Sequence, residues 1–318
     1  MSEMFAPVRA EPTVEDVLRV QLTQGDAVIG TIAPILRHLL ANDDHSLFND
    51  EIVARVRGII DHIARQVLDA VEDAQGNGAR RDHGEEAIAR VVAELVERSA
   101  LLGHAHAQAL EFQLTERLQA RIALDPVLSP LLQALVASQD SGTAASAVAL
   151  LAAQARFVQA QRRMQLPLGE LPADLFHEVL QALRSLEAEP ATLTAAEKTL
   201  RANYDEGRSR LGLLSRLVHG MGGGAAAALD VSHAGVGLFL TALSLGAGQD
   251  RDLTALAAHE GQLARLALAL RAAGARPEAI EGQFLAIHPD VSLPKGFDAL
   301  GADRAAAMLA GSLAGAGR

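Results

Sequence analysis

The residue pair with the most specific chemistry in this sequence is His177 with Glu178, in the segment ADLFHEVLQAL at 173–183. An exposed histidine on a helix can accept a phosphoryl group when a neighbouring carboxylate raises the basicity of the imidazole and fixes its tautomer. No glycine pattern for nucleotide binding follows the pair, which excludes a complete kinase. His177 is therefore a candidate phosphoacceptor with Glu178 as its partner, and an ordinary surface histidine is the alternative interpretation.

Two other groups of polar residues resemble metal ligands in type but not in spacing. The connector NDDHSLFND at 42–50 gathers carboxylates and a histidine, yet it matches no calcium loop and lacks the turn glycine of one. His104 and His106 are two residues apart, so a helix turns them to different faces, and we interpret them as solvent-facing or interface residues. We expect no metal site and no cofactor, and we interpret the connector as the acidic entry to a helix.

Signatures of the common catalytic motifs are absent from the sequence. The segment GMGGGAAAALD at 220–230 lacks the Lys and the Ser or Thr of a phosphate-binding loop, and its small residues favour close approach of helix backbones. There is no Gly-x-Ser-x-Gly elbow, and without cysteine the chain has no thiolate nucleophile. We therefore assign no catalytic residue and expect a protein that is not an enzyme.

The composition predicts an all-α fold of stacked helical hairpins. Hydrophobic residues make up 49% of the chain against 21% charged residues, which excludes a disordered chain. Aromatic residues are only 3%, so the apolar content is mostly Ala, Leu, Val and Ile, and Ala and Leu are the strongest helix formers.

A net charge of −11 argues against nucleic-acid binding, which needs Lys and Arg to neutralise phosphates. The lack of cysteine and of a signal-peptide pattern at the N-terminus predicts a cytoplasmic protein.

An uncharged stretch over 231–249 approaches the length of a membrane span. Its mostly apolar part, 234–247, has 14 residues. A span needs about 20 predominantly apolar residues, whereas runs of about 10 to 14 are more often buried core helices. We therefore predict a buried helix here and no membrane span.

The clearest helix in the sequence is predicted over 51–74. Apolar residues recur there at spacings of three and four, which places them on one stripe of the helix, while the charged residues fall mainly on the rest of its surface. Such a stripe has to be covered, either by the same chain or by a second copy. We therefore name it both as core and as a candidate face for self-association: Ile52, Val56, Ile59, Ile63 and Val67.

A weak internal echo about 105 residues apart predicts two related helical units. Each unit would have an apolar face that only a neighbouring unit can cover, as in repeat-like helical proteins. The matching segments are LLQAL at 131–135 with FLTAL at 239–243, LAAQ at 151–154 with LAAH at 256–259, and Pro172 with Pro277.

These patterns divide the chain into four predicted segments. The pair Asp125-Pro126 stops a helix, because the residue before a proline avoids helical backbone angles, and it marks the boundary between two helical domains. We expect a flexible tail over 1–12, an N-terminal helical domain over 13–125, a helical domain with the two related units over 126–288, and a C-terminal tail with a short helix over 289–318.

Two longer segments carry a resemblance to a known family. They are LLANDDHSLFNDEIVARVRGI at 39–59 and LLAAQARFVQAQRRMQLPLGELPADLFHEVLQAL at 150–183. In these the chain is similar to a family of uncharacterised alphaproteobacterial helical proteins, catalogued as a domain of unknown function. The resemblance covers roughly 100–280, implies an array of helical pairs, and brings no catalytic residues with it.

Three hypotheses of function follow. The first is a regulatory or scaffolding module that acts through protein contacts and forms a homo-oligomer, because stacked helices present extended surfaces without catalytic groups. The second is a small-molecule sensor with an apolar pocket between the Gly/Ala-rich helices at 222–248. The third is a phosphotransfer protein that uses His177.

Overall fold

The protein is built from helices, as its composition predicts. The computed structural model describes residues 12–41, 51–76 and 83–313, and these contain fourteen α-helices, five short 3-10 helices and no strand. The first seven α-helices are α1 (Val14–Ala41), α2 (Glu51–Ala74), α3 (Glu85–Val96), α4 (Ser99–Ile122), α5 (Pro130–Val136), α6 (Ser141–Arg162) and α7 (Ala173–Arg184).

The second half of the chain has shorter helices and most of the 3-10 turns. Its α-helices are α8 (Pro190–Asn203), α9 (Arg210–Gly220), α10 (Val231–Ala247), α11 (Arg251–Ala257), α12 (Leu263–Ala272), α13 (Pro277–Ile287) and α14 (Ala302–Leu313). The 3-10 helices are η1 (Leu168–Glu170), η2 (Glu206–Arg208), η3 (Gly222–Leu229), η4 (Glu260–Gln262) and η5 (Phe297–Ala299).

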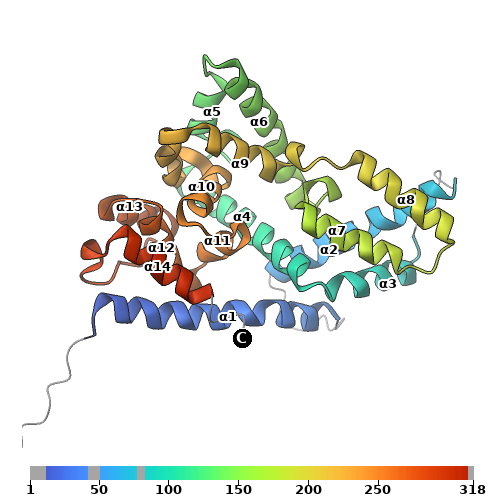
Figure 1. Cartoon of the computed structure of the whole chain (residues 1–318), viewed down its shortest axis with the longest axis horizontal. Helices are drawn as coiled ribbons and strands as arrows, with labels where there is room; N and C mark the ends of the chain where they lie inside the picture. Colours follow the sequence, from blue (N-terminus) through green and yellow to red (C-terminus); the bar gives the residue numbers. More distant parts are fainter. Residues whose placement is uncertain (1–11, 42–50, 77–82, 314–318) are drawn as a thin grey trace, which may run out of the picture.

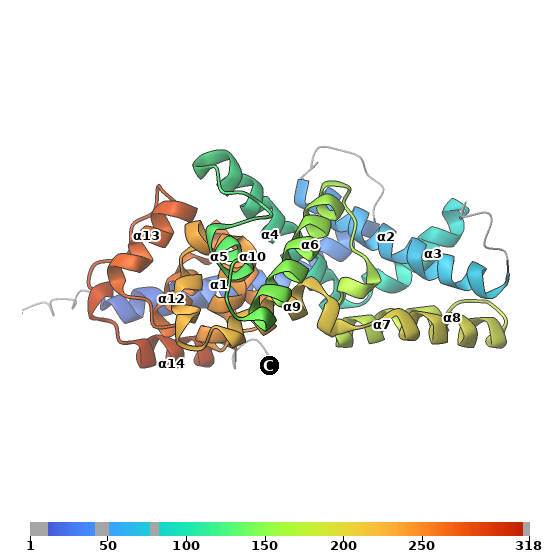
Figure 2. The same ribbon diagram turned by 90° about the horizontal axis from the view of Figure 1, so that it is seen from above.

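The helices form two groups that share α1 and α4. One group consists of α2, α3, α7 and α8, and the other of α5, α6 and α9 to α14, while α1 runs along one edge of the molecule (Figure 1). Figure 2 shows the same separation from above, with α7 and α8 at one end and α12 to α14 at the other. Each group has its own apolar cluster, and α1 and α4 contribute side chains to both clusters. The predicted domain boundary after residue 125 therefore does not divide the core. Helices α1 and α4, which precede this residue, pack with helices that come before it and with helices that come after it.

The apolar stripe of α2 lies in the interior. Its five side chains, Ile52, Val56, Ile59, Ile63 and Val67, are between 0% and 7% exposed and join the cluster shared with α3, α4, α7 and α8. This corrects the predicted self-association face, since the chain covers the stripe itself. The periodicity was right about burial, but spacing alone does not tell whether the covering helix comes from the same chain.

The internal echo falls on helices of unequal length. The first pair of segments lies in α5, which has 7 residues, and in α10, which has 17. The second pair lies in α6, which has 22 residues, and at the end of α11, which has 7. Only α7 and α13, with 12 and 11 residues, are alike. The structure therefore does not establish a duplication, and the repeat remains a prediction.

The segment after 288 belongs to the core as far as it is described. Helix α14 packs on α12 and α1, and Phe297, Leu300 and Leu309 are buried in the same cluster as α10. The predicted C-terminal tail is therefore part of the folded body up to Leu313. The predicted N-terminal tail over 1–12 lies, apart from Pro12, outside the described residues.

Helix α10 is buried, as its uncharged sequence predicts. No single described helix is long and apolar enough to cross a membrane, and the pair η3 and α10 passes that test only jointly, with a bend of 115° between them. Within α10 the backbone breaks at Gly235, where φ is +75°. A Cβ at this position would lie 2.9 Å from the Cβ of Ser129, and the Ser129 hydroxyl donates a hydrogen bond of 2.7 Å to the carbonyl of Ala234. Glycine is thus required here by both conformation and space.

We expect Gly235→Ala to destabilise the protein more than Gly248→Ala. Gly248 is left-handed helical, which for alanine costs about 1–2 kcal/mol, and nothing lies within 4 Å of a Cβ there. Gly235, at φ 75° and ψ 159°, lies in a region that essentially only glycine adopts, and the neighbouring Ser129 must also shift, which adds roughly 1 kcal/mol or more. Urea unfolding of the two variants measures the difference, and equal losses would contradict the requirement for glycine at 235.

Candidate functional site

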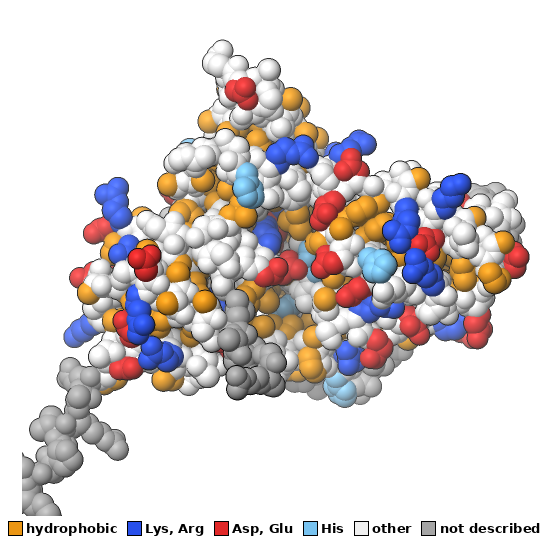
Figure 3. Space-filling view, viewed as in Figure 1, with side chains coloured by type: hydrophobic (Ala, Val, Ile, Leu, Met, Phe, Trp, Pro, Cys, Tyr) orange, Lys and Arg blue, Asp and Glu red, His pale blue; other side chains and the backbone are white. Residues whose placement is uncertain are grey.

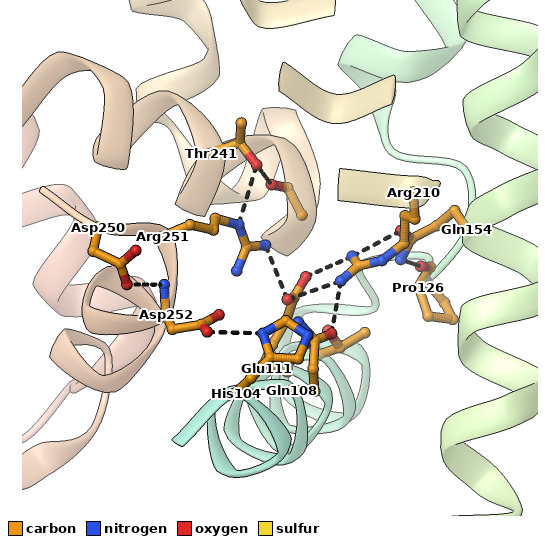
Figure 4. A network of polar contacts seen from close by, with 12 residues as sticks. His104, Gln108, Glu111, Pro126, Gln154, Arg210, Thr241, Asp250, Arg251 and Asp252 are labelled. Carbon is orange, nitrogen blue, oxygen red and sulfur yellow. Dashed lines mark hydrogen bonds and ion pairs between the residues drawn. The ribbon is translucent and has the colours of Figure 1, made fainter. Parts of the chain in front are cut away.

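The most unusual feature of the interior is a carboxylate held by two guanidinium groups. Glu111 on α4 is 1% exposed. Arg210 donates to both of its oxygens, with distances of 2.7 Å from Nη1 to Oε1 and 3.0 Å from Nη2 to Oε2. Arg251 donates from Nη2 to Oε2 at 2.9 Å (Figure 4). A single carboxylate thus joins α4 to α9 and α11, whose contributing residues lie 99 and 140 positions away in the sequence.

Both arginines stand at the first residue of their helices. Ser209 caps α9 by accepting from the N–H of Gly212, and Asp250 caps α11 by accepting from the N–H groups of Asp252 and Leu253. A helix N-terminus carries partial positive charge, so a cation there is unfavourable unless an anion is close. Glu111 supplies that anion to both helices at once.

Neutral side chains complete the shell around Arg210. Its Nη2 also donates to Oε1 of Gln108 at 3.1 Å. Its guanidinium carbon lies 3.6 Å from the centroid of the Phe157 ring, and Phe157 meets Phe112 edge to face at 6.3 Å. Cation–π contacts of this kind stabilise a desolvated arginine. The aromatic pair therefore stabilises the buried guanidinium of Arg210 in place of the water that would solvate it at the surface.

A histidine–aspartate pair adjoins the same cluster. His104 on α4 is 1% exposed, and its Nδ1 lies 2.7 Å from Oδ2 of Asp252, the residue after Arg251. This corrects the prediction that His104 faces solvent or an interface. The missed signal is a polar stripe on α4, since residues spaced by three and four share one helix face. Its buried members are His104, Gln108, Glu111 and Thr115.

The surroundings keep both carboxylates of the cluster ionised. Burial acts to raise the pKa of Glu111, but Arg210 and Arg251 outweigh it through their charges and hydrogen bonds and lower the pKa to about 2. For Asp252, burial is likewise outweighed by His104 and Arg251, so its pKa lies below the ordinary value. Neither group is a proton donor near neutral pH. General acid catalysis instead needs a carboxyl pKa raised toward the working pH.

Arg251 links the buried cluster to a surface groove. The groove has a volume of about 650 Å³ and lies between η2, α9, α10 and α11. Figure 3 shows that this face of the molecule is hollowed where the two groups of helices meet, with basic and acidic side chains in and around the hollow. The charged and titratable side chains that line the groove are Glu206, Arg216, His219 and Arg251.

Three nitrogen atoms of the cluster are buried without a hydrogen-bond partner among the described residues. They are Nη1 of Arg251, Nε2 of His104 and Nε2 of Gln108. Buried polar atoms of folded proteins are almost always paired, with protein, water or a ligand. Of these three residues, Arg251 is the one that also lines the groove.

The predicted phosphoacceptor lies elsewhere. His177 is exposed on α7, while Glu178 is partly buried and its Oε2 has no hydrogen-bond partner among the described residues. No hydrogen bond joins the His177 ring to Glu178 in the described parts of the chain. The carboxylate therefore does not orient the imidazole here, and phosphotransfer through His177 remains a prediction.

Two further predictions have different outcomes. The acidic connector at 42–50 lies outside the described residues, and within the described ranges no group of three or more His, Asp or Glu is arranged to hold a metal ion. The pocket predicted near 222–248 has a counterpart in the groove, which Thr241, Ser244 and Leu245 line. The groove is not purely apolar, however, because Arg216, His219 and Arg251 also line it.

Comparison with known proteins finds no family model, no curated protein and no solved structure that matches this chain. The resemblance to the alphaproteobacterial helical family therefore remains a prediction. A fold of packed helices hosts many unrelated functions, so function has to be argued from the site itself.

We expect Glu111→Gln to destabilise the fold by about 3–5 kcal/mol at neutral pH, because two buried guanidinium groups lose their counter-charge. The effect depends on pH in a defined direction. The pKa of Glu111 is lowered to about 2 in the folded state, so its stabilisation is complete above about pH 4.5 and is lost as pH falls toward 2. Urea unfolding between pH 7 and pH 2.5 measures both effects.

The matched control is Glu94→Gln, which removes one negative charge from an exposed position on α3. Surface changes of this kind usually alter stability by less than about 0.5 kcal/mol. If the two variants lose the same stability at pH 7, the buried ion pairs do not have the role assigned to them.

Proposed function

We propose that this protein is a non-catalytic binding module that holds a small anionic ligand in the groove beside Arg251. The observation that carries this is the basic lining of the groove, in which the guanidinium of Arg251 lies together with Arg216 and His219. Guanidinium groups bind carboxylates and phosphates through paired hydrogen bonds.

The charged side chains that line the groove favour binding of an anion. Arg216 and Arg251 line it with a single carboxylate, Glu206, and His219 adds a further positive charge when protonated. The whole chain carries −11, whereas the side chains that line the groove carry more positive than negative charge, with Arg251 also paired to Glu111 behind it in the cluster. A groove of about 650 Å³ falls within the roughly 300–1,000 Å³ of small-molecule sites. A small organic phosphate or carboxylate fits both the size and the charge.

The electrostatics favour binding over catalysis. The low pKa of Glu111 keeps it as a permanent counter-ion, and the side chain of His104 is only 1% exposed. A general acid or base would need to reach the substrate and titrate near the working pH. We place this binding module in the cytoplasm, since a chain without cysteine suits a reducing compartment.

A thermal-shift series with inorganic phosphate, pyrophosphate and succinate tests this function. A ligand that binds the folded state alone stabilises it by about 2.7 kcal/mol at about 100 times its Kd. We expect at least one probe to raise the Tm beyond the effect of potassium chloride at equal ionic strength. We expect the double variant Arg216→Ala/His219→Ala to lose that shift, because both side chains line the groove.

The control variant is Arg162→Ala, which removes an exposed arginine at the end of α6, away from the groove. It should respond to the probes as the unmodified protein does. If no probe raises the Tm, or if the groove variant responds as strongly as the control, the groove is not an anion site.

A regulatory or scaffolding role through protein contacts is a second candidate function. It is favoured by the outer side of α1, which exposes Val20, Val28 and Ile35. Exposed apolar side chains that gather on one face are typical of interaction surfaces. The two candidate functions are compatible, since the groove is lined by α9, α10 and α11 and not by α1.

A further inference from the structure

The proton on the ring of His219 is placed by the fold. His219 lies in the last turn of α9, and its Nδ1 is 2.8 Å from the backbone carbonyl oxygen of Ser215, one turn earlier in the helix. The Ser215 hydroxyl is the more distant partner of the same nitrogen, at 3.4 Å. Since a carbonyl oxygen only accepts hydrogen bonds, Nδ1 carries a proton and is the donor. In the neutral ring Nε2 therefore has a lone pair, which accepts hydrogen bonds and donates none.

The Nε2 atom of His219 is left for a ligand of the groove. His219 is exposed and lines the groove beside Arg251. No hydrogen bond joins Nε2 to the residues that the structure describes, 12–41, 51–76 and 83–313. Histidine is also the side chain whose charge changes between about pH 5 and 8. What Nε2 offers to a ligand, a lone pair or an N–H donor, thus depends on pH.

The buried donors in the lining are engaged within the protein. The hydroxyls of Thr241 and Ser244 donate to backbone carbonyl oxygens at 2.8 Å and 2.7 Å. Arg251 donates from Nε to the Thr241 hydroxyl at 3.3 Å and from Nη2 to Glu111 at 2.9 Å. These groups contribute charge and shape to the groove, and their hydrogen atoms point to partners in the chain.

The exposed side chains of the lining that can donate to a ligand are Arg216 and His219. Both lie on α9, three residues apart and therefore on one face of the helix. Arg216 donates from Nη2 to the carbonyl of Gly207 at 2.9 Å, which leaves other N–H groups of its guanidinium for a ligand. The other exposed residues of the lining, Glu206 and Leu245, have no side-chain donor near neutral pH. We therefore expect an anion in the groove to meet both donors on α9.

The fixed tautomer decides how an anion can bind at His219. A lone pair on Nε2 repels an anionic oxygen, whereas a protonated Nε2 donates a charge-assisted hydrogen bond to it. We infer that an anion enters this groove together with a proton, which passes from the solvent to Nε2 of His219. The inference rests on the proposed function of the groove and adds its regulation. Anion affinity is then highest at acidic pH and falls as pH rises through the range in which the ring titrates.

The charges around His219 favour a ring that is protonated when an anion is bound. The last turn of a helix favours a cation, and so does a bound anion, whereas the arginines of the lining repel a third positive charge. The lining residues of α10 are uncharged, and η3 consists of Gly, Ala and Leu. Helix α6 also packs on α9, but neither of its charged residues, Arg156 and Arg162, lines the groove. The charged side chains that line the groove with His219 are Glu206 of η2, Arg216 of α9 and Arg251 of α11.

Isothermal titration calorimetry of the full chain with sulfate tests the inference. Sulfate carries no proton between pH 5.5 and pH 8, so any proton that is taken up on binding goes to the protein. At pH 7.5 and constant ionic strength, the binding heats in two buffers of different ionisation enthalpy should differ by an amount that approaches one proton per sulfate. We expect the affinity to fall at least about tenfold between pH 5.5 and pH 8, because one linked proton changes affinity by up to about tenfold per pH unit.

The variant His219→Gln separates the hydrogen bond from the proton. A glutamine amide donates an N–H at every pH, so the affinity of this variant for sulfate should change by less than about threefold between pH 5.5 and pH 8. Its binding heat should not depend on the buffer. The matched control is His177→Gln, which replaces an exposed histidine on α7 outside the groove. The control should keep the proton uptake and the pH dependence of the unmodified protein.

The possible results distinguish the inference from the proposed function. Sulfate binding that is equally tight at pH 5.5 and pH 8, with no dependence on the buffer, would overturn the inference and leave the groove as an anion site. A pH dependence that persists in His219→Gln would also overturn it, and so would binding of phosphate without binding of sulfate at pH 5.5. If neither sulfate nor the probes of the thermal-shift series bind, the proposed function fails and the inference fails with it.

Discussion

The carboxylate of Glu111 is the constraint on which the rest of the structure depends. An isolated charge in a protein interior is unfavourable by several kcal/mol, so each buried guanidinium near it requires this anion. Arg210 and Arg251 stand at the starts of α9 and α11, where the helix dipole adds to the penalty. Glu111 on α4 therefore supplies the counter-charge at the start of both helices.

The same centre connects the two groups of helices. Arg55 on α2 lies over the Phe112 ring at 4.5 Å, Phe112 meets Phe157 edge to face, and Arg210 lies over Phe157. This series of contacts runs from the α2 group, through α4 and α6, to the Glu111 cluster. Because cation–π contacts depend on position and desolvation, a shift of α4 would weaken them together with the ion pairs.

Sequence patterns predicted what local spacing can determine. The all-α class, the burial of the 52–67 stripe and the burial of α10 all follow from composition and periodicity. The cluster was missed because its partners are distant in sequence: His104 and Asp252 are 148 residues apart, and Glu111 and Arg210 are 99 apart. Periodicity also cannot distinguish a stripe covered by its own chain from one left exposed. For that reason the sequence pattern indicated the stripe of α2 as an interaction face, whereas in the structure the apolar side chains that stay exposed include Val20, Val28 and Ile35 of α1.

The most direct test of the central role of Glu111 is a double-mutant cycle with Glu111→Gln, Arg210→Met and both changes together, measured by urea unfolding. If the carboxylate and the guanidinium depend on each other, each single change leaves a buried group uncompensated. The double variant should then be more stable than the sum of the two losses predicts, by more than about 1 kcal/mol. Losses that add within about 0.5 kcal/mol would contradict the account.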